Sequence, residues 1–291
     1  MYLPQSFFSI FSHFVFPFFP FGSFFPFMMV FISIFGKAIS ERMNPMEQQS
    51  KKQIPQVESR LRHHILEMPK EILKASGIVI FGRRIKSLVF TTDLAIIKNC
   101  DADAVFAVYP FTPQQSISDA IIKASYIPVF CGVGGGTTQG LRTISLAKDV
   151  ESQGAMGVVL NAPISDGNLL AVSRSVDIPT IITVTDEKTN VASRIECGAS
   201  ILNVAAAEKT PELVRRIRSQ FPDIPIIATG GNKPHTILAT IEAGANAITY
   251  TPPSTQEMFK AMMSHYREEL PKEPALPHRR HTQKEKRNVC R

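Results

Sequence analysis

The chain has few cysteines, and their spacing excludes two kinds of fold. Only Cys100, Cys131, Cys197 and Cys290 occur among 291 residues. No two of them form a Cys-x-x-Cys pair, and none lies at metal-ligand spacing from a histidine. A disulfide framework and a structural zinc site are therefore excluded, and the pattern favours a reducing, cytoplasmic location.

The central part of the chain lacks an excess of positive charge, although the formal net charge is +7. Residues 271–291 carry seven Lys and Arg against two Glu, so most of the excess lies in this tail. No basic stripe remains elsewhere, which excludes nucleic acid as the main partner. The Pro-rich, polar tail is predicted to be disordered. An arm that touches RNA or lipid is the alternative.

Charged residues are absent before Lys37, and 13 of the 20 Phe lie in residues 1–42. By length alone, residues 5–36 could span a bilayer. No positive residue precedes the apolar run, however, and Pro17, Pro20 and Pro26 interrupt it. We therefore predict that residues 1–42 are an upstream extension outside the folded domain. A membrane anchor over residues 5–36 is the alternative, and no membrane contact is expected for the folded part.

Two short strings alternate along the middle of the chain. Ile-Pro precedes an apolar run at residues 127–128, 178–179 and 224–225, and Gly-Ala precedes one at residues 154–155, 198–199 and 244–245. Stretches of helical composition separate them. A block that repeats in this way is typical of alternating βα units.

Apolar runs bounded by Gly, Pro, Asp and Asn predict eight strands. They cover residues 87–92, 104–109, 128–133, 157–161, 180–185, 200–204, 226–230 and 247–251. The helices between and after them are predicted at residues 93–99, 114–124, 139–153, 164–175, 187–196, 211–221, 234–243 and 255–270. Eight units in this length indicate an α/β fold, the (β/α)8 TIM barrel.

A doubly wound open sheet is the structural alternative. That fold places a glycine-rich nucleotide fingerprint after its first strand, whereas this chain has Thr91, Thr92 and Asp93 there. The barrel is therefore preferred and assigned to residues 87–270. Residues 43–86 precede it, with a helix over 56–76 and a short extra strand over 78–82 that turns through Arg83 and Arg84. Both are expected to close the N-terminal end of the barrel.

In such a barrel the chemistry lies where the strands end, at their C-terminal side. The most informative loop follows the third strand and contains Gly132, Gly134, Gly135 and Gly136. These glycines are expected to let the backbone approach a ligand and direct its N–H groups inward. Thr137 and Thr138 are expected to cap the next helix. The spacing matches neither G-x-G-x-x-G nor a P-loop, so no dinucleotide or ATP is implied.

Residues 226–250 carry a family resemblance. The segment IIATGG, followed by a short helix and IEAGANAI, resembles the last quarter of the aldolase-type, phosphate-binding barrels. Thiamine-phosphate synthase, keto-deoxy-phosphogluconate aldolase and N-acetylmannosamine-6-phosphate epimerase belong to that group. The resemblance implies that Thr229, Gly230 and Gly231 bind a phosphate with a second loop after the eighth strand. The whole chain also resembles uncharacterised barrel proteins of Gram-positive bacteria that are loosely labelled hydrolase.

The second half of this phosphate site departs from the family pattern. Thr251, Pro252 and Pro253 stand where the family usually has a glycine. Two consecutive prolines offer no N–H group to a phosphate. Ser254 and Thr255 could replace part of this function from the start of the last helix.

Three residues are the candidates for catalysis. Asp93 and Asp186 follow strands and could act as acid and base, or each could simply cap its helix. Cys131 could be a nucleophile beside the glycine loop, or a buried and inert cysteine. Asn161 and Asn203 could bind a carbonyl group or a sugar hydroxyl group.

Absences at the strand ends narrow the chemistry. No lysine lies inside a predicted strand, which argues against a Schiff-base aldolase. No cluster of His, Asp and Glu implies a tightly bound catalytic metal. No cofactor is firmly implied, and Mg²⁺ is considered only as an ion that bridges Asp93 or Asp186 to a substrate.

These observations predict a cytoplasmic barrel enzyme of lyase, isomerase or synthase type. Its substrate is expected to be a small anionic metabolite, phosphorylated or carboxylated. A hydrolase that uses Cys131 or an Asp-activated water is one alternative, and a non-catalytic barrel that binds a metabolite is the other. A homo-oligomer is compatible with the sequence.

Overall fold

The structure is a computed structural model and describes residues 55, 57 and 65–269. The predicted extension at residues 1–42, its alternative anchor at 5–36 and the predicted tail at 271–291 lie outside the described residues. The domain limits proposed from the sequence stay predictions. Within the described part of the chain, no helix is long and apolar enough to cross a membrane.

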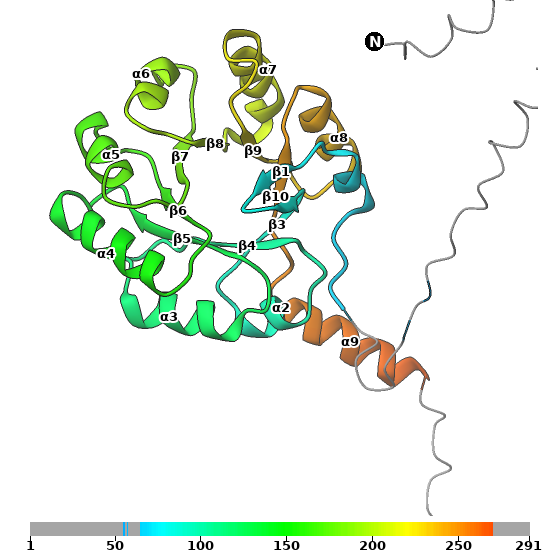
Figure 1. The fold of residues 1–291 in the computed structure, drawn as a ribbon. Coiled ribbons are helices and arrows are strands. Elements are labelled where there is room, and N and C mark those ends of the chain that lie inside the picture. The colour runs from blue at the N-terminus through cyan, green and yellow to red at the C-terminus, as the bar shows by residue number, and fades with distance from the viewer. Residues whose placement is uncertain (1–54, 56, 58–64, 270–291) are drawn as a thin grey trace, which may run out of the picture. The chain divides into compact units, whose positions relative to one another are not determined.

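Eight parallel strands close into a barrel in the order β10-β3-β4-β5-β6-β7-β8-β9 (Figure 1). They are β3 (Ser87–Phe90), β4 (Ala104–Ala107), β5 (Val129–Gly134), β6 (Gly157–Leu160), β7 (Thr180–Val184), β8 (Ile201–Val204), β9 (Ile226–Thr229) and β10 (Ala247–Tyr250). Each predicted strand is present, so the predicted (β/α)8 barrel is confirmed.

Helices follow the strands and surround the barrel wall (Figure 1). They are α2 (Leu94–Lys98), α3 (Gln115–Ala124), α4 (Leu141–Ser152), α5 (Asp166–Ser173), α6 (Val191–Glu196), α7 (Thr210–Gln220), α8 (Pro234–Glu242) and α9 (Thr255–Glu269), with the short 3₁₀ helix η3 (Ala207–Lys209) before α7. Every helix predicted after a strand is found, with shorter limits in most cases.

The alternating strings mark the N-terminal ends of strands. The carbonyl groups of Pro128, Pro179 and Pro225 accept hydrogen bonds from Val105, Val158 and Leu202 of the neighbouring strands. A proline at a strand start can accept in this way although it has no N–H group to donate. Gly154 and Gly244 follow α4 and α8 with φ of 96° and 113°, a left-handed conformation that favours glycine.

A hairpin closes the N-terminal end of the barrel. It consists of β1 (Ile78–Ile80) and β2 (Arg83–Ile85), which pair antiparallel. Ile78, Ile80 and Ile85 pack with the side chains inside the barrel, including Leu88 and Phe130. The predicted extra strand is thus confirmed. Its turn lies at Phe81 and Gly82, both with positive φ, and not at the predicted pair Arg83 and Arg84.

The helix predicted over residues 56–76 differs from the structure. In the described part of that range only η2 (Lys70–Lys74) is helical, and it is a 3₁₀ helix. Leu66 instead forms a parallel bridge with Cys100. Ile72 of η2 packs into the outer core with Val89 and Ile248. The apolar spacing that suggested a long helix therefore comes from an irregular segment that packs beside α8 and pairs with the chain at Cys100.

Two apolar layers hold the barrel together, because alternate residues of a strand point to opposite sides. Inside the barrel lie Leu88, Phe106, Phe130, Val159, Ile181, Ile201 and Ile227. Between the sheet and the helices lie Val89, Val105, Cys131, Val158, Ile182, Leu202 and Ile248. This alternation assigns every rim residue to the barrel interior or to the outer layer.

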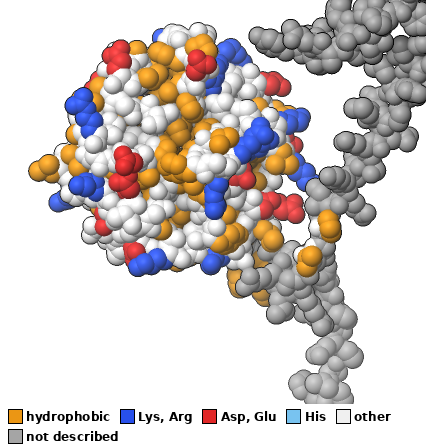
Figure 2. Space-filling model, viewed as in Figure 1, with side chains coloured by type: hydrophobic (Ala, Val, Ile, Leu, Met, Phe, Trp, Pro, Cys, Tyr) orange, Lys and Arg blue, Asp and Glu red, His pale blue; other side chains and the backbone are white. Residues whose placement is uncertain are grey.

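The face that carries the hairpin is partly apolar. Figure 2, viewed as Figure 1, shows hydrophobic side chains gathered near the middle of this face. Val79 and Phe81 of the hairpin are 67% and 66% exposed. The opposite end of the barrel, where the strands end, is called the barrel mouth below.

Candidate functional site

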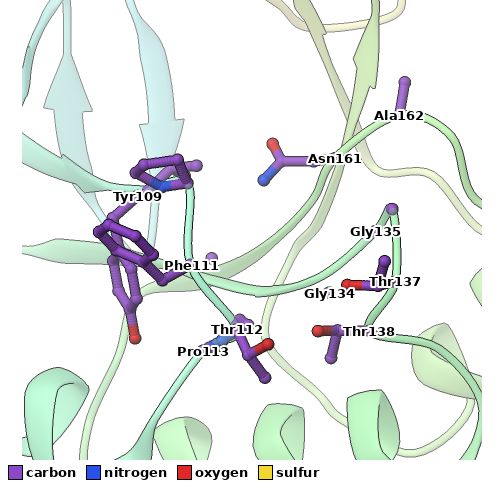
Figure 3. Close-up of a pocket in the computed structure, with 14 residues that line it drawn as sticks. Tyr109, Phe111, Thr112, Pro113, Gly134, Gly135, Thr137, Thr138, Asn161 and Ala162 are labelled. Atoms are coloured by element: carbon purple, nitrogen blue, oxygen red, sulfur yellow. The ribbon is translucent and has the colours of Figure 1, made fainter.

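A pocket of about 320 Å³ lies at the barrel mouth, where β4, β5 and β6 end (Figure 3). Three segments form it: the loop after β4, the glycine loop of β5 and the end of β6. Its lining residues are Val108, Tyr109, Pro110, Phe111, Thr112, Pro113, Gly132, Gly134, Gly135, Gly136, Thr137, Thr138, Asn161 and Ala162. The pocket lies where substrates bind in (β/α)8 barrels.

The glycine loop is shaped by its packing against the end of β6. The pairing of β5 with β6 is irregular between Gly132 and Gly134. A Cβ atom on Gly135 would lie 2.1 Å from the carbonyl oxygen of Asn161, so only glycine fits. Gly136 is also left-handed, with φ of 61°, but faces open space. Glycine is thus needed at position 135 because the backbone of Asn161 lies too close for a side chain.

The N–H groups of this loop do not all face the pocket, which corrects the sequence prediction. The N–H group of Gly135 donates to the carbonyl of Thr138 at 2.9 Å, and that of Gly136 donates to the carbonyl of Pro163 at 2.9 Å. Both groups are therefore used inside the loop and are unavailable to a ligand. The glycines shape the pocket more than they supply its donors.

Thr137 and Thr138 do not cap the next helix as predicted. The helix α4 begins at Leu141, and Gly140 occupies the N-cap position without a side-chain hydrogen bond. Thr138 is buried and Thr137 is exposed. The side chains of Thr112 and Thr138 face each other across the pocket (Figure 3). The threonines thus supply hydroxyl groups to the pocket wall.

Asn161 joins the pocket to a row of polar side chains inside the barrel. The Thr183 hydroxyl group donates to Asn161 Oδ1 at 3.4 Å, and Asn203 Nδ2 donates to Thr183 Oγ1 at 3.2 Å. Asn203 is buried, and its Oδ1 has no hydrogen-bond partner among the described residues. Asn161 lines the pocket, whereas Asn203 does not. The structure thus links the two predicted asparagines through Thr183.

Sequence reasoning missed Thr183 and much of the loop after β4. The strand was predicted at residues 180–185, so the candidate that followed from it was Asp186, beyond the strand, and not Thr183 within it. Thr183 is the register partner of Asn203, and this interior position could have identified it. Phe111, Thr112 and Pro113 belong to a loop without helix or strand signals. Only Pro110 and Pro113, which restrict the backbone, could have indicated an ordered loop there.

Cys131 does not reach the barrel mouth, which corrects its assignment as a nucleophile. The side chain is 1% exposed and packs in the outer core layer with Val105 and Val158. Burial raises the pKa of the Cys131 thiol to about 12. A thiol that faces the helices and stays protonated cannot attack a ligand in the pocket.

Asp93 is a helix cap. Its Oδ1 accepts from the N–H group of Ala95 at 2.8 Å, and Oδ2 accepts from the hydroxyl group of Thr255. The Thr255 hydroxyl, with the N–H groups of Ala95 and Ile96, lowers the pKa of this carboxyl group despite the opposing effect of burial. Asp93 therefore joins α2 to the start of α9, and it does not line the pocket.

Asp186 shapes a turn and not a helix cap. Its Oδ1 accepts from the N–H groups of Lys188 and Thr189 at 2.9 and 3.1 Å. Asn190 caps α6, which begins later than predicted. Asp186 lines a separate, smaller pocket of about 130 Å³ beside Asn190 and Arg216. Because β3 and β7 stand on opposite sides of the barrel, the two carboxylates are not brought together.

The loop after β9 contains Gly230 and Gly231, for which phosphate binding stays a prediction. Gly230 is buried against Ile248, and Gly231 has φ of 72°. The hydroxyl groups of Thr229 and Thr249 lie 3.2 Å apart and link β9 to β10 inside the barrel. Gly231 is followed by α8, which begins at Pro234 without a side-chain cap.

The loop after β10 does not supply the second half of a phosphate site. The N–H and hydroxyl groups of Ser254 both donate to Glu257 Oε2 at 2.8 Å, and Ser254 Oγ accepts from the N–H group of Glu257 at 3.2 Å. This is a capping box. Thr255 is bonded to Asp93. The groups expected to replace the missing glycine are thus already hydrogen-bonded within the chain.

The donor set around the main pocket does not fit a resident Mg²⁺. No cluster of three His, Cys, Asp or Glu side chains occurs within residues 65–269 that could hold a metal ion. Among the described lining residues, Tyr109 is the only titratable side chain, and its hydroxyl oxygen accepts from the N–H group of Gln114. Mg²⁺ is usually held by at least one carboxylate.

Comparison with known proteins gives the fold class. No protein-family model and no curated protein sequence matches the chain. Among solved structures, phosphoenolpyruvate phosphomutase from Streptomyces platensis subsp. rosaceus matches with a TM-score of 0.50 and 13% identity. The match covers 62% of this chain and 81% of that chain.

A second solved structure is similar to the same degree. It is 2,3-dimethylmalate lyase, described as a phosphoenolpyruvate mutase/isocitrate lyase superfamily member, with a TM-score of 0.50 and 11% identity. The match covers 68% of this chain and 81% of that chain. The chain therefore has the fold of an aldolase-type (β/α)8 barrel. The narrower resemblance to thiamine-phosphate synthase and the epimerase is not supported by these neighbours.

Proposed function

We propose that the protein is a cytoplasmic enzyme of lyase, isomerase or synthase type that binds a small anionic metabolite in the pocket at β4–β6. One observation carries the proposal: the glycine loop of β5 packs against the backbone at Asn161 and leaves a pocket of about 320 Å³ at the barrel mouth. Pockets of this size and place hold substrates in this fold.

Neutral donors make the pocket suitable for an anion. Asn161 Nδ2 has no partner within residues 65–269, and the hydroxyl groups of Thr112 and Thr137 also belong to the lining. The helix α4 begins at Leu141, which does not line the pocket. Hydrogen bonds from neutral donors can stabilise an oxyanion without a cationic side chain.

A carboxylated ligand fits this proposal better than a phosphorylated one. The predicted phosphate site at β9–β10 keeps Gly230 and Gly231, but Ser254 and Thr255 are bonded to Glu257 and Asp93. Neither hydroxyl group is therefore free to bind a phosphate. The names of the two neighbours, which contain phosphoenolpyruvate and dimethylmalate, guide only the choice of probes.

Asp93 and Asp186 stay in the proposal as acid–base candidates to be tested. Neither carboxylate lines the pocket, and the hydrogen bonds that lower the pKa of Asp93 make it a weaker base than an ordinary aspartate. Mg²⁺ is included in the proposal only as an ion that is coordinated by oxygen atoms of the substrate. For the hydrolase alternative, Cys131 is no longer a candidate nucleophile. Only a water molecule activated by an aspartate remains.

A non-catalytic, metabolite-binding barrel is the second candidate. It is favoured by the lining of the pocket, where Tyr109 is the only titratable side chain among the described residues. General acid–base catalysis needs a positioned group that can exchange a proton. Binding without turnover needs no such group.

The test uses the full chain and a panel of oxyanions: inorganic phosphate, sulfate, oxalate, malate and phosphoenolpyruvate. We expect at least one of them to raise the melting temperature, with malate or oxalate ahead of phosphate. Gly135→Ala should abolish the shift. Gly154→Ala is the matched control, since Gly154 is also left-handed, its Cβ meets no atom within 4 Å and it does not line the pocket. A panel that shifts nothing contradicts the proposal. Proton NMR of the bound probe over hours separates turnover from binding alone.

A further inference from the structure

Three polar side chains form a row inside the barrel, one directly after β6, one on β7 and one on β8. Asn161, Thr183 and Asn203 are called the polar ladder here. Thr183 and Asn203 are register partners, and Asn161 follows β6 at the next position after Leu160, the partner of Ile182. Interior positions one step down the strands hold Val159, Ile181 and Ile201, which are apolar. The ladder is therefore the layer at which the interior changes from apolar to polar.

The hydrogen bonds of the ladder run in one direction. Asn203 Nδ2 donates to Thr183 Oγ1, and the same hydroxyl group donates to Asn161 Oδ1. The row therefore ends in a donor at Asn161 Nδ2 and in an acceptor at Asn203 Oδ1. The donor end lines the pocket. The acceptor end is unpartnered among the described residues, on a side chain that is only 6% exposed.

An unpaired amide oxygen at this depth is unusual. Buried polar groups nearly always have a hydrogen-bond partner, and an exception calls for an explanation. The Asn203 position adds nothing to the apolar core and costs stability as long as Oδ1 is unpaired. A ligand that donates a hydrogen bond to Oδ1 would remove that cost. Since the oxygen is closed to solvent, such a ligand would have to displace the side chains that cover it, while Asn203 Nδ2 keeps its hydrogen bond to Thr183.

We propose that the polar ladder selects a polyhydroxylated carboxylic acid, a sugar acid, as the ligand of this pocket. This inference rests on the proposed function. The carboxylate accepts hydrogen bonds from Asn161 Nδ2 and the pocket donors, and a hydroxyl group of the ligand donates to Asn203 Oδ1. Neighbouring strands lie about 4.8 Å apart, so the two ends belong to backbones roughly 10 Å apart. A chain of several carbon atoms is needed to reach both.

Three six-carbon dicarboxylates test this selection directly. D-Glucarate and galactarate carry four hydroxyl groups each, and adipate has the same carbon chain without them. Binding to the full chain is measured by titration calorimetry or by ligand-observed NMR at one pH and ionic strength. We expect one of the hydroxylated acids to bind at least about tenfold more tightly than adipate, because adipate leaves Asn203 Oδ1 unpaired. Equal binding of all three overturns the proposal.

Variants of Thr183 test whether the ladder is responsible. Thr183→Val keeps the shape of the side chain but removes the hydroxyl group that joins the two asparagines. The variant should bind the hydroxylated acid and adipate with about equal affinity. Thr183→Ser keeps the hydroxyl group and should retain the preference. Thr180→Val is the matched control, because Thr180 is a buried threonine on the opposite face of the same strand. A Thr183→Val protein that keeps the preference overturns the proposal.

Asn203→Leu tests whether the ladder recognises the ligand or only supports the structure. This variant should remain folded. It removes the unpaired Oδ1 together with the Nδ2 donor to Thr183 and puts an apolar group of similar size in their place, so the unliganded protein should lose little stability. The preference for the hydroxylated acid should nevertheless disappear. If Asn203→Leu retains the preference, the ladder is only a structural layer and the proposal is wrong.

The outcomes separate this inference from the proposed function. If no oxyanion of the panel and none of the three dicarboxylates binds, the proposed function fails and this inference fails with it. If oxalate or malate binds at the pocket but the hydroxylated acids do no better than adipate, only this inference fails.

Discussion

The carbonyl oxygen of Asn161 occupies the space that a side chain on Gly135 would need. A Cβ atom built on Gly135 would lie 2.1 Å from this oxygen and 2.9 Å from Asn161 Cα. The close approach joins the glycine loop of β5 to the end of β6, and the pocket lies beside the junction. The shape of the candidate site therefore depends on one residue without a side chain.

Gly135→Ala should destabilise the protein more than Gly136→Ala. Both positions have positive φ, which costs alanine about 1–2 kcal/mol. Only Gly135→Ala adds a clash with backbone, for which overpacking suggests about 1–3 kcal/mol more. Urea denaturation of both variants measures the difference. Equal stabilities would contradict the close approach described here.

Cys131 should be unreactive in the folded protein. With a pKa of about 12, roughly one molecule in ten thousand carries the thiolate at pH 8. Iodoacetamide labelling followed by peptide mass spectrometry should modify Cys197, which is partly exposed, well before Cys131. Labelling of Cys131 should appear only in denaturant. Rapid labelling of Cys131 under native conditions would restore it as a candidate nucleophile.

Asp93→Ala should lower stability by about 1 kcal/mol at pH 7, the usual effect of losing an N-cap. The pKa of Asp93 is lower in the folded protein than in the unfolded chain. Its contribution is therefore present above the unfolded pKa, near 4, and is lost as the pH falls through the folded value. The stability difference between parent and variant should shrink below pH 4. Thr255→Val, which removes the largest cause of the shift, should weaken this pH dependence while the cap remains.

Ser254→Ala should affect the last helix and not the pocket. The change removes the capping box at the start of α9, which costs about 1 kcal/mol of helix stability. Hydrogen exchange should become faster in the first turns of α9. Binding of oxyanions at β4–β6 should stay the same. Loss of oxyanion binding would instead indicate that the loop after β10 holds the ligand.

Phe81→Asn should stabilise the hairpin that closes the N-terminal end. Phe81 has φ of 47° and precedes Gly82, with φ of 77°, in a two-residue turn. Asn-Gly suits such a turn, and a bulky residue at positive φ is strained. A gain of up to about 1 kcal/mol is expected, measured as a higher melting temperature. Gly82→Ala should have the opposite effect.

The sequence predicted the fold because its information is local and repeated. Each Ile-Pro and Gly-Ala string marks a strand start or a helix end, and these signals depend on φ and on the missing N–H group of proline. The eight strands appear where the apolar runs predicted them. The segment before the barrel had no repeat to support it, and its apolar spacing predicted a long helix where only η2 is helical.

The candidate site was predictable only in part. The glycine loop and Asn161 were found, because glycine clusters and strand ends can be seen in a sequence. Cys131 was placed in the site wrongly, because one step along a strand turns a side chain from the interior to the outer layer. Ser254 looked free until the structure paired it with Glu257.

The sequence by itself determined the barrel, since eight similar units bury continuous apolar strands only when they close on one another. Only the tertiary structure decided which residues share a site. It brought Asn161, Thr183 and Asn203 into one row and separated Asp93 from Asp186, because register and strand order, unlike composition, depend on contacts between distant segments.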